Sequence, residues 1–155
     1  MLGEKVVPMG AIAYAFSEEG AGIDGKSFSL LPVEIFYRET GKTKKVTEYP
    51  CDGKLLKAAE QVKTKYHTGR GVIGSGDEWN NQLDRIALLR ERYHTAVEDM
   101  ESAAAAQLCL SYGVPFLGVR ILSNSIVNGE KFDEAVGIDG QKFMLSLVDQ
   151  MREYM

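Results

Sequence analysis

The chain has little cysteine, no long apolar run and no excess of positive charge. Its 155 residues contain two cysteines, Cys51 and Cys109, which are too few for the disulfide framework of a small secreted protein. A net charge of -4 argues against nucleic acid as a main partner, because phosphate binding requires a cationic surface. No stretch is long enough to cross a bilayer, and the opening MLGEKVV lacks the layout of a secretory signal. We therefore expect a cytoplasmic protein that binds neither nucleic acid nor a membrane.

Histidine is also scarce, and the two histidines and two cysteines are scattered along the chain without metal-ligand spacing. We therefore expect no metal site. The composition is otherwise that of a folded protein, with 45% apolar and 26% charged residues. The sequence shows no repeat, low-complexity tract or interdomain linker, so residues 1–155 are expected to form a single domain.

Strand-like and helix-like segments alternate from residue 52 onward. Strands are expected at residues 5–16, 33–37, 70–74, 96–99 and 114–122. Helices are expected at residues 52–66, 81–93 and 100–112 and in a last segment that is capped by Asp139. The alternation predicts an α/β fold with a mixed, largely parallel sheet that is covered by helices. The run 114–122 is almost continuously apolar, which is typical of a strand with both faces covered.

One glycine-rich string, Gly20 to Ser27, formally fits the P-loop pattern of nucleotide hydrolases. Its surroundings favour a plain glycine turn instead. Glu18, Glu19 and Asp24 would place negative charge beside the phosphates, and Pro32 leaves no room for the long helix that follows a true P-loop. A P-loop hydrolase therefore remains a remote alternative.

The segment GSGDEWNNQ, residues 74–82, follows an expected buried strand directly. Its residues should therefore lie at the carboxyl edge of the sheet, where open α/β sheets bind ligands. It contains Trp79, the only tryptophan, whose ring could stack on a planar base. The competing interpretation is a tryptophan that covers the core under the next helix.

Three carboxylates, Glu98, Asp99 and Glu101, lie within four positions where a helix begins. Such a cluster is repulsive unless something pairs with it, and Arg120 on a neighbouring apolar segment could do so. Glu101 could accept hydrogen bonds from the hydroxyls of a sugar. A purely structural Glu–Arg pair is the alternative.

The strings DMESAAAAQLC and VPFLGVRILSN, preceded by the Ser-Gly-Asp turn and its aromatic residue, resemble the purine nucleoside phosphorylase and nucleosidase superfamily. The most similar branch is the 5′-methylthioadenosine/S-adenosylhomocysteine nucleosidases. The match runs in the same order from about Gly71 to the C-terminus, and the opening segment fits more loosely. The resemblance implies a phosphorylase/hydrolase-like fold, cleavage of the N-glycosidic bond of a nucleoside, and no metal or organic cofactor.

The resemblance also implies roles for individual residues. Met100 and Glu101 would hold the ribose hydroxyls, and Arg120 would organise the acidic cluster. Trp79 would lie against the base, and the backbone of Asn80 would contact the edge of the base. Phe132, in the string KFDEA, would form a wall of the site.

The pair Ser123-Asn124 departs from the nucleosidase branch, which carries Ser-Asp there. A carboxylic acid can protonate N7 of the departing purine, whereas an amide can only hydrogen-bond to it. Superfamily branches that act on 6-oxopurines use asparagine in this region. The resemblance therefore places Ser123 among the substrate-binding residues and gives Asn124 the catalytic position, with an inosine-, guanosine- or futalosine-like substrate or with activity lost. A turn residue that opens the next loop is the alternative for Asn124.

The superfamily begins with a further set of strands and glycine turns that this sequence does not contain. Those parts activate water or hold phosphate, so hydrolysis and phosphorolysis both stay open. We expect the chain to be the C-terminal, substrate-binding part of the fold, working as a homodimer or larger assembly or with a separate N-terminal polypeptide. A non-catalytic nucleoside-binding or storage relative is the alternative from another class, and Asn124 favours it.

Overall fold

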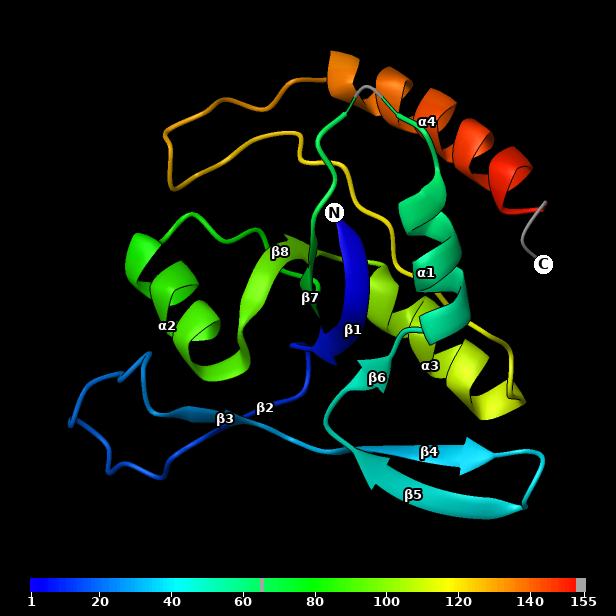
Figure 1. Ribbon diagram of the computed structural model, residues 1–155. Coiled ribbons are helices and arrows are strands. Elements are labelled where there is room, and N and C mark those ends of the chain that lie inside the picture. The colour runs from blue at the N-terminus through cyan, green and yellow to red at the C-terminus, as the bar shows by residue number, and fades with distance from the viewer. Residues whose placement is uncertain (65, 153–155) are drawn as a thin grey trace.

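A four-stranded sheet runs through the centre of the molecule in the order β6-β1-β7-β8 (Figure 1). The structure is a computed structural model and describes residues 1–64 and 66–152. The strands span Leu2–Pro8 (β1), Tyr49–Pro50 (β6), Arg70–Ser75 (β7) and Thr95–Asp99 (β8). β1, β7 and β8 are mutually parallel, and β6 is antiparallel to β1. The predicted mixed, largely parallel sheet is therefore confirmed.

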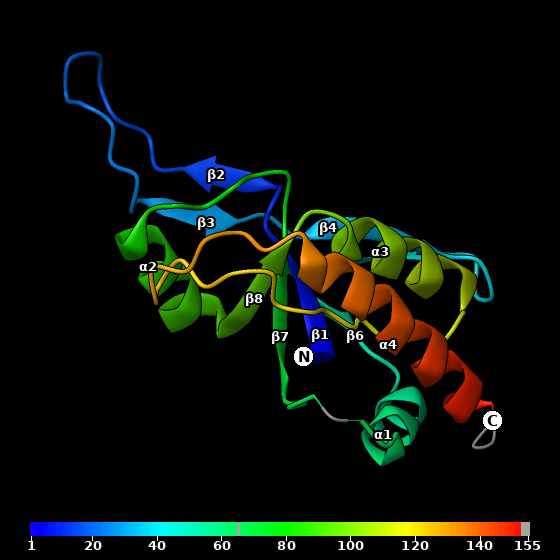
Figure 2. The same cartoon turned by 90° about the horizontal axis from the view of Figure 1, so that it is seen from above.

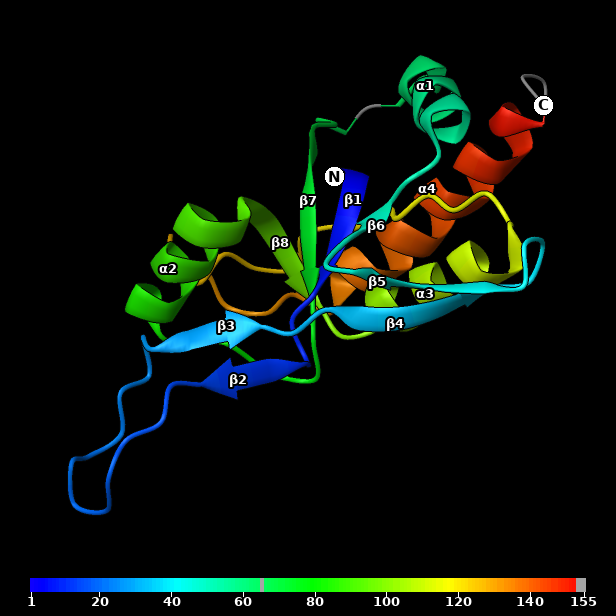
Figure 3. The same ribbon diagram turned by 90° about the horizontal axis from the view of Figure 1, so that it is seen from below.

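Two antiparallel hairpins lie beside this sheet. One pairs β2 (Ile12–Tyr14) with β3 (Phe28–Leu30), and the other pairs β4 (Val33–Tyr37) with β5 (Lys42–Val46). The β2–β3 hairpin projects from the body of the molecule, and its long connection forms the tip (Figures 2 and 3). This connection contains residues 20–27, and Ser27 leads into strand β3 rather than into a helix. The P-loop interpretation is therefore wrong.

Helices cover both faces of the sheet. They span Gly53–Gln61 (α1), Leu83–Tyr93 (α2), Ser102–Tyr112 (α3) and Ala135–Met151 (α4). On one face, Leu89 of α2 packs with Val7 and Val72 of the sheet. On the other, Ala106 of α3 packs with Val6 and Ile73. Adjacent strand residues thus serve opposite faces, as the alternation of side chains along a strand requires.

A third apolar cluster joins α1 to α4. Its buried members are Leu2, Leu56, Ala58, Ala59, Val62, Leu147 and Met151. α1 begins where the sequence predicts, because the side chain of Asp52 accepts hydrogen bonds from the backbone amides of Lys54 and Leu55, both at 2.9 Å. Among the described residues, no helix is both long and apolar enough to span a membrane.

Several predicted boundaries differ from the structure. The strand expected at 5–16 is instead β1 (Leu2–Pro8) followed by β2 (Ile12–Tyr14), and α2 begins at Leu83, two residues after its predicted start. α1 ends at Gln61, so its expected continuation is wrong for residues 62–64 and 66, while residue 65 lies outside the described part. α4 begins at Ala135 rather than at Asp139, and Asp133 accepts a hydrogen bond from the amide of Ala135 at 2.9 Å. α3 begins at Ser102, two residues after the predicted start.

The apolar run 114–122 is not a regular strand, contrary to the prediction. It touches β1 through a single bridge between Leu2 and Val119 and a hydrogen bond from the amide of Gly3 to the carbonyl of Gly118 at 2.7 Å. β6 occupies the same edge of β1 further along, so only a few residues of the run reach the strand. The run nevertheless lies close against the sheet, since a Cβ at Gly118 would lie 2.6 Å from the side chain of Ile73 in β7.

Candidate active site

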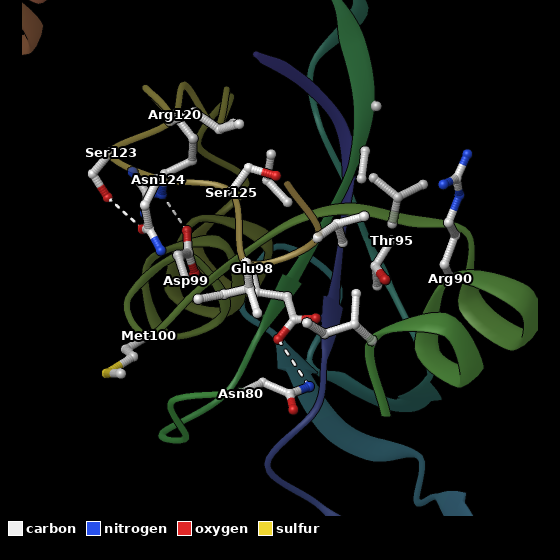
Figure 4. A pocket seen from close by; sticks show the side chains of 18 of the residues that line it. Asn80, Arg90, Thr95, Glu98, Asp99, Met100, Arg120, Ser123, Asn124 and Ser125 are labelled. Atoms are coloured by element: carbon white, nitrogen blue, oxygen red, sulfur yellow. Dashed lines mark hydrogen bonds and ion pairs between the residues drawn. The ribbon is translucent and has the colours of Figure 1, made fainter. Parts of the chain in front are cut away.

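A cavity of about 1060 Å³ extends along β7 and β8 and reaches their carboxyl ends (Figure 4). Ser75 and Asp99, which end these parallel strands, lie opposite each other in the sheet register. Open α/β sheets bind ligands at this edge. The cavity brings together every residue that the sequence singled out for the site: Trp79, Asn80, Met100, Glu101, Arg120, Ser123, Asn124 and Phe132.

An aromatic wall forms one side of the cavity. Trp79, in the connection after β7, and Phe132, in the connection before α4, meet edge to face with ring centroids 6.4 Å apart. The indole nitrogen of Trp79 donates a hydrogen bond to the side chain of Asn81 at 3.0 Å, which fixes the ring. Trp79 is 58% exposed and lines the cavity, so the alternative of a tryptophan that covers the core is wrong.

The acidic cluster is organised around Asp99, whose side chain is only 7% exposed. Arg120 forms an ion pair with this carboxylate and donates a second hydrogen bond to the hydroxyl of Ser102 at 2.7 Å. The amide of Ser102 donates to Asp99 at 3.1 Å, so the carboxylate also holds the first turn of α3. The sequence pointed to Arg120 as the partner of the cluster but did not identify which carboxylate it binds.

Asp99 remains ionised because its surroundings favour the charge. Burial raises the pKa of Asp99, but hydrogen bonds from Ser102, Ser75 and Arg120 outweigh burial and hold the pKa below its usual value. The buried Ser75 hydroxyl also accepts a hydrogen bond from the amide of Ala103 at 2.9 Å. This network ties the ends of both strands to the start of α3 and gives the cavity a rigid floor.

Glu101 is left available by this arrangement. Its carboxylate lies 3.9 Å from a terminal nitrogen of Arg120 and is 78% exposed, whereas Asp99 takes the shorter contact. The short structural ion pair of Arg120 is thus made with Asp99, and the Glu101–Arg120 contact that the sequence offered as the alternative is present only as a long pair. Glu101 and Met100 are set at the junction of β8 and α3, on the rim of the cavity.

Asn124 enters the cavity from the chain that follows the apolar run. The hydroxyl of Ser123 donates a hydrogen bond to the side-chain oxygen of Asn124 at 3.1 Å. With its oxygen engaged, the amide of Asn124 presents its NH₂ group as the remaining polar group. Glu101 and Asn124, from distant parts of the sequence, therefore line one and the same cavity.

Glu98 also lines the cavity, although the sequence reasoning gave it no individual role. The side-chain nitrogen of Asn80 donates a hydrogen bond to its carboxylate at 3.4 Å (Figure 4). Burial raises the pKa of Glu98, and the hydrogen bond from Asn80 opposes that rise only in part. The signal that could have found it is its place in the acidic cluster at the end of β8, where Val97 and Asp99 line the same cavity.

Within residues 1–64 and 66–152, no three His, Cys, Asp or Glu side chains gather in a way that could hold a metal ion. The polar groups of the cavity are carboxylates, amides, hydroxyls, guanidinium groups and an imidazole, beside aromatic rings. This is the kind of lining that binds small molecules with an apolar face and several polar groups.

An α/β sheet with a polar, aromatic-walled cavity at the carboxyl ends of its parallel strands defines a small-molecule-binding protein of the type found among α/β enzymes. Its family follows from comparison with known proteins. The model of the phosphorylase superfamily matches residues 2–151, and the chain belongs to that superfamily.

Similar sequences carry the same enzyme name. The chain is 34% identical over 129 residues to the 5′-methylthioadenosine/S-adenosylhomocysteine nucleosidase of Bacillus pumilus, covering 76% of this chain and 55% of that protein. It is 32% identical over 125 residues to the nucleosidase of Aeromonas salmonicida with the same name, covering 76% and 54%. The chain thus spans about half the length of the curated relatives it matches.

Solved structures share the fold. The native futalosine hydrolase of Helicobacter pylori aligns with a TM-score of 0.62 and 21% identity, covering 96% of this chain and 58% of that one. The Helicobacter pylori protein titled MTAN aligns with a TM-score of 0.61 and 22% identity, covering 96% and 59%. At these identities the likeness shows the common fold alone.

Proposed function

We propose that this chain binds a purine nucleoside in the cavity and takes part in breaking its N-glycosidic bond. The observation that carries the proposal is that Glu101, Trp79 and Asn124 line one cavity, whose volume of about 1060 Å³ has room for a nucleoside. The similar sequences, which carry the name of a nucleosidase, support the same chemistry.

The ribose would lie at the rim formed by Met100 and Glu101. A carboxylate there accepts hydrogen bonds from the ribose hydroxyls, and such charge-assisted bonds contribute roughly 1.5–3 kcal/mol each. Cleavage of the glycosidic bond passes through an oxocarbenium-like transition state. The negative charge of Glu101 would therefore also stabilise the positive charge that develops on the sugar.

The base would lie against the aromatic wall of Trp79 and Phe132. Stacking of a base on an aromatic ring is worth roughly 1–3 kcal/mol and tolerates different purines. Selection among purines must therefore come from polar groups, and the proposal assigns it to the backbone of Asn80 and the amide of Asn124, which both line the cavity.

Asn124 favours a 6-oxopurine. Its oxygen is engaged by Ser123, so its NH₂ group is left to donate to the acceptors N7 and O6 of such a base. An adenine presents an amino group in place of O6, and two donors would then face each other.

A non-catalytic nucleoside-binding protein is the second candidate, and Asn124 is the observation that favours it. An amide cannot protonate the leaving purine, which removes an effect worth about 10²–10⁴-fold in rate. Binding would persist because the aromatic wall and Glu101 do not depend on this proton. In either case we propose an assembly of two or more copies in the cytoplasm.

The test is an assay of free-base release from inosine, guanosine, futalosine and 5′-methylthioadenosine, with and without phosphate, beside a direct binding measurement. Release that needs no phosphate indicates a nucleosidase, and release that depends on phosphate indicates a phosphorylase. Binding without release indicates the binding protein. Absence of both from all four nucleosides would contradict the proposal.

The matched variant for this assay is Glu101→Gln, which keeps the size of the side chain and removes its charge. We expect it to weaken nucleoside binding roughly 10- to 100-fold, as loss of a charge-assisted hydrogen bond does. The exposed Glu91→Gln on α2 serves as the control and should bind as the parent does.

A further inference from the structure

We propose that Arg85 is a positioning residue that links the β2–β3 hairpin to the aromatic wall of the cavity, so that a displacement of the hairpin shifts Trp79. The inference goes beyond the proposed function and does not depend on it, because its test reads the indole ring itself. Arg85 lies in the first turn of α2 and does not line the cavity, whereas Glu78 and Trp79 do.

The segment that carries Trp79 has few tethers. Residues 76–82 connect β7 to α2 without forming a helix or a strand. Glu78, directly before Trp79, accepts a side-chain hydrogen bond from Arg85 at 3.3 Å. Asn80, directly after Trp79, donates a side-chain hydrogen bond to a carboxylate of β8 at 3.4 Å. Loss of the bond from Arg85 would therefore leave one of these two tethers beside the indole.

The hairpin reaches Arg85 through the ring of Phe28 in β3. The hairpin projects from the body of the molecule, but Phe28 is 6% exposed and packs in the core with Leu89 of α2 (Figures 2 and 3). The guanidinium carbon of Arg85 lies over the ring, 4.1 Å from its centroid, within the range of a cation–π contact. Arg92, two turns further along α2, lies over the same ring at 5.3 Å and donates a hydrogen bond to the carbonyl of Phe28 at 3.0 Å. Phe28 thus holds β3 against α2.

One side chain therefore contacts both the hairpin and the wall segment. A guanidinium is planar, so it can face an aromatic ring and donate from its edge at the same time. The side chain of Arg85 is only 13% exposed, and a charge with so little access to water is held by its partners. In the part of the chain that the structure describes, Glu78 makes no other ion pair within 4.0 Å. A shift of Phe28 would thus move the group that holds Glu78.

The experiment uses the fluorescence of Trp79, which is the only tryptophan and so reports on this segment alone. The emission maximum and the quenching by acrylamide are compared for the full chain, Arg85→Gln, Phe28→Leu and the combination of both. We expect each single variant to shift the emission to longer wavelength and to raise the quenching constant, because Trp79, 58% exposed in the parent, loses part of its cover. The double variant should match Arg85→Gln alone, since the link is already cut.

Three further variants sharpen the comparison. Arg152→Gln is the matched control, because it removes an arginine from an ion pair with Asp149 at 3.8 Å on another helix, and it should leave the emission unchanged. Arg85→Lys keeps the charge but not the planar group, so it should restore the emission of the parent only in part. Arg92→Gln releases the carbonyl of Phe28 without a change in the core. It should shift the emission as Phe28→Leu does, and it replaces that variant if Phe28→Leu does not fold.

The outcomes distinguish a link from a purely structural arginine. A structural role would lower the melting temperature of Arg85→Gln and leave the emission of the folded protein as in the parent, which would overturn the inference. Equal shifts by Phe28→Leu in the parent and in Arg85→Gln would also overturn it, because the hairpin would then act on Trp79 by another route. Each spectrum is recorded well below the melting temperature of its variant, so that unfolded protein does not contribute.

Discussion

At the scale of a single residue, the proposed function makes Asn124 the limit on the chemistry, because an amide cannot give a proton to N7 of a departing base. Asn124→Asp would restore a carboxylic acid at the same place without a change in size. We expect base release from 5′-methylthioadenosine to rise about 10²–10⁴-fold, the usual worth of general acid catalysis. The measurement is kcat from released adenine.

The control for this substitution is Asn128→Asp, which adds the same charge on an exposed position of the loop, away from the cavity lining. It should leave kcat unchanged. Equal rates for Asn124→Asp and the parent would mean that the amide position does not address N7.

A second prediction at this scale concerns Asp99 and the pH dependence of the free energy of unfolding. The folded-state pKa of Asp99 is depressed below its usual value, so its ionised form is favoured by folding. Its contribution is therefore fully present above the unfolded pKa and is lost as pH falls through the folded pKa. Asp99→Asn should lower the free energy of unfolding by roughly 1.5–3 kcal/mol at pH 7, the worth of a hydrogen bond to a charged group, and less at pH 3.

Urea unfolding at pH 7, 5 and 3 measures this effect. The matched control is Asp149→Asn, which removes a carboxylate that is 76% exposed and pairs with Arg152 at 3.8 Å. Surface pairs of this kind contribute little, so its stability should follow that of the parent at each pH. A parallel shift of Asp99→Asn at all three pH values would argue against the depressed pKa.

How far the site could be predicted is also decided at the residue scale. Four site residues could be predicted because they are polar or aromatic side chains at the ends of apolar segments: Trp79, Glu101, Arg120 and Asn124. The structure brings all four to one cavity. Which carboxylate Arg120 binds could not be predicted, because three lie within four positions and only the backbone geometry decides between them.

At the scale of the helix, α1 shows what local sequence determines. Asp52 ends an extended segment and its side chain accepts two amide hydrogen bonds from the first turn of α1. Such a cap forms from neighbours in sequence, and so it could be predicted before the fold was known. The end of α1 could not, because the apolar spacing continues past Gln61 while the chain turns away toward β7.

The worth of this cap is directly measurable. Asp52→Ala should lower the free energy of unfolding by about 1 kcal/mol, because two amides of the first turn lose their acceptor. Asp52→Asn keeps a cap of similar quality and should lose much less. Chemical denaturation of both variants tests this, and an equal loss would assign the effect to the negative charge at the helix N-terminus instead of to the hydrogen bonds.

The run 114–122 shows where element-scale reasoning fails. Its apolar composition indicates burial, and part of it is buried against β1. Composition does not say which strand offers a free edge, however, and β6 takes much of the edge of β1. Regular strand pairing is a property of two partners, so a single segment cannot predict it.

At the scale of the whole molecule, the β2–β3 hairpin stands out because it projects from the body of the molecule (Figure 3). Phe16 and Ile23 in its connection are 92% and 99% exposed. Exposed apolar groups that project together are typical of a protein–protein contact. We therefore propose this hairpin as a contact between copies of the chain in the assembly.

The paired substitution Phe16→Ser and Ile23→Ser tests this contact through molar mass in solution, measured by light scattering on a sizing column. The parent should elute at twice 17.1 kDa or more and the double variant at 17.1 kDa, because removal of two large side chains takes away the apolar area that drives association. Leu145→Ser is the control, since that residue is 69% exposed on α4, away from the hairpin. A parent that is already monomeric would refute the assembly. If Leu145→Ser dissociates the assembly and the double variant does not, the contact between copies lies on α4 and not on the hairpin.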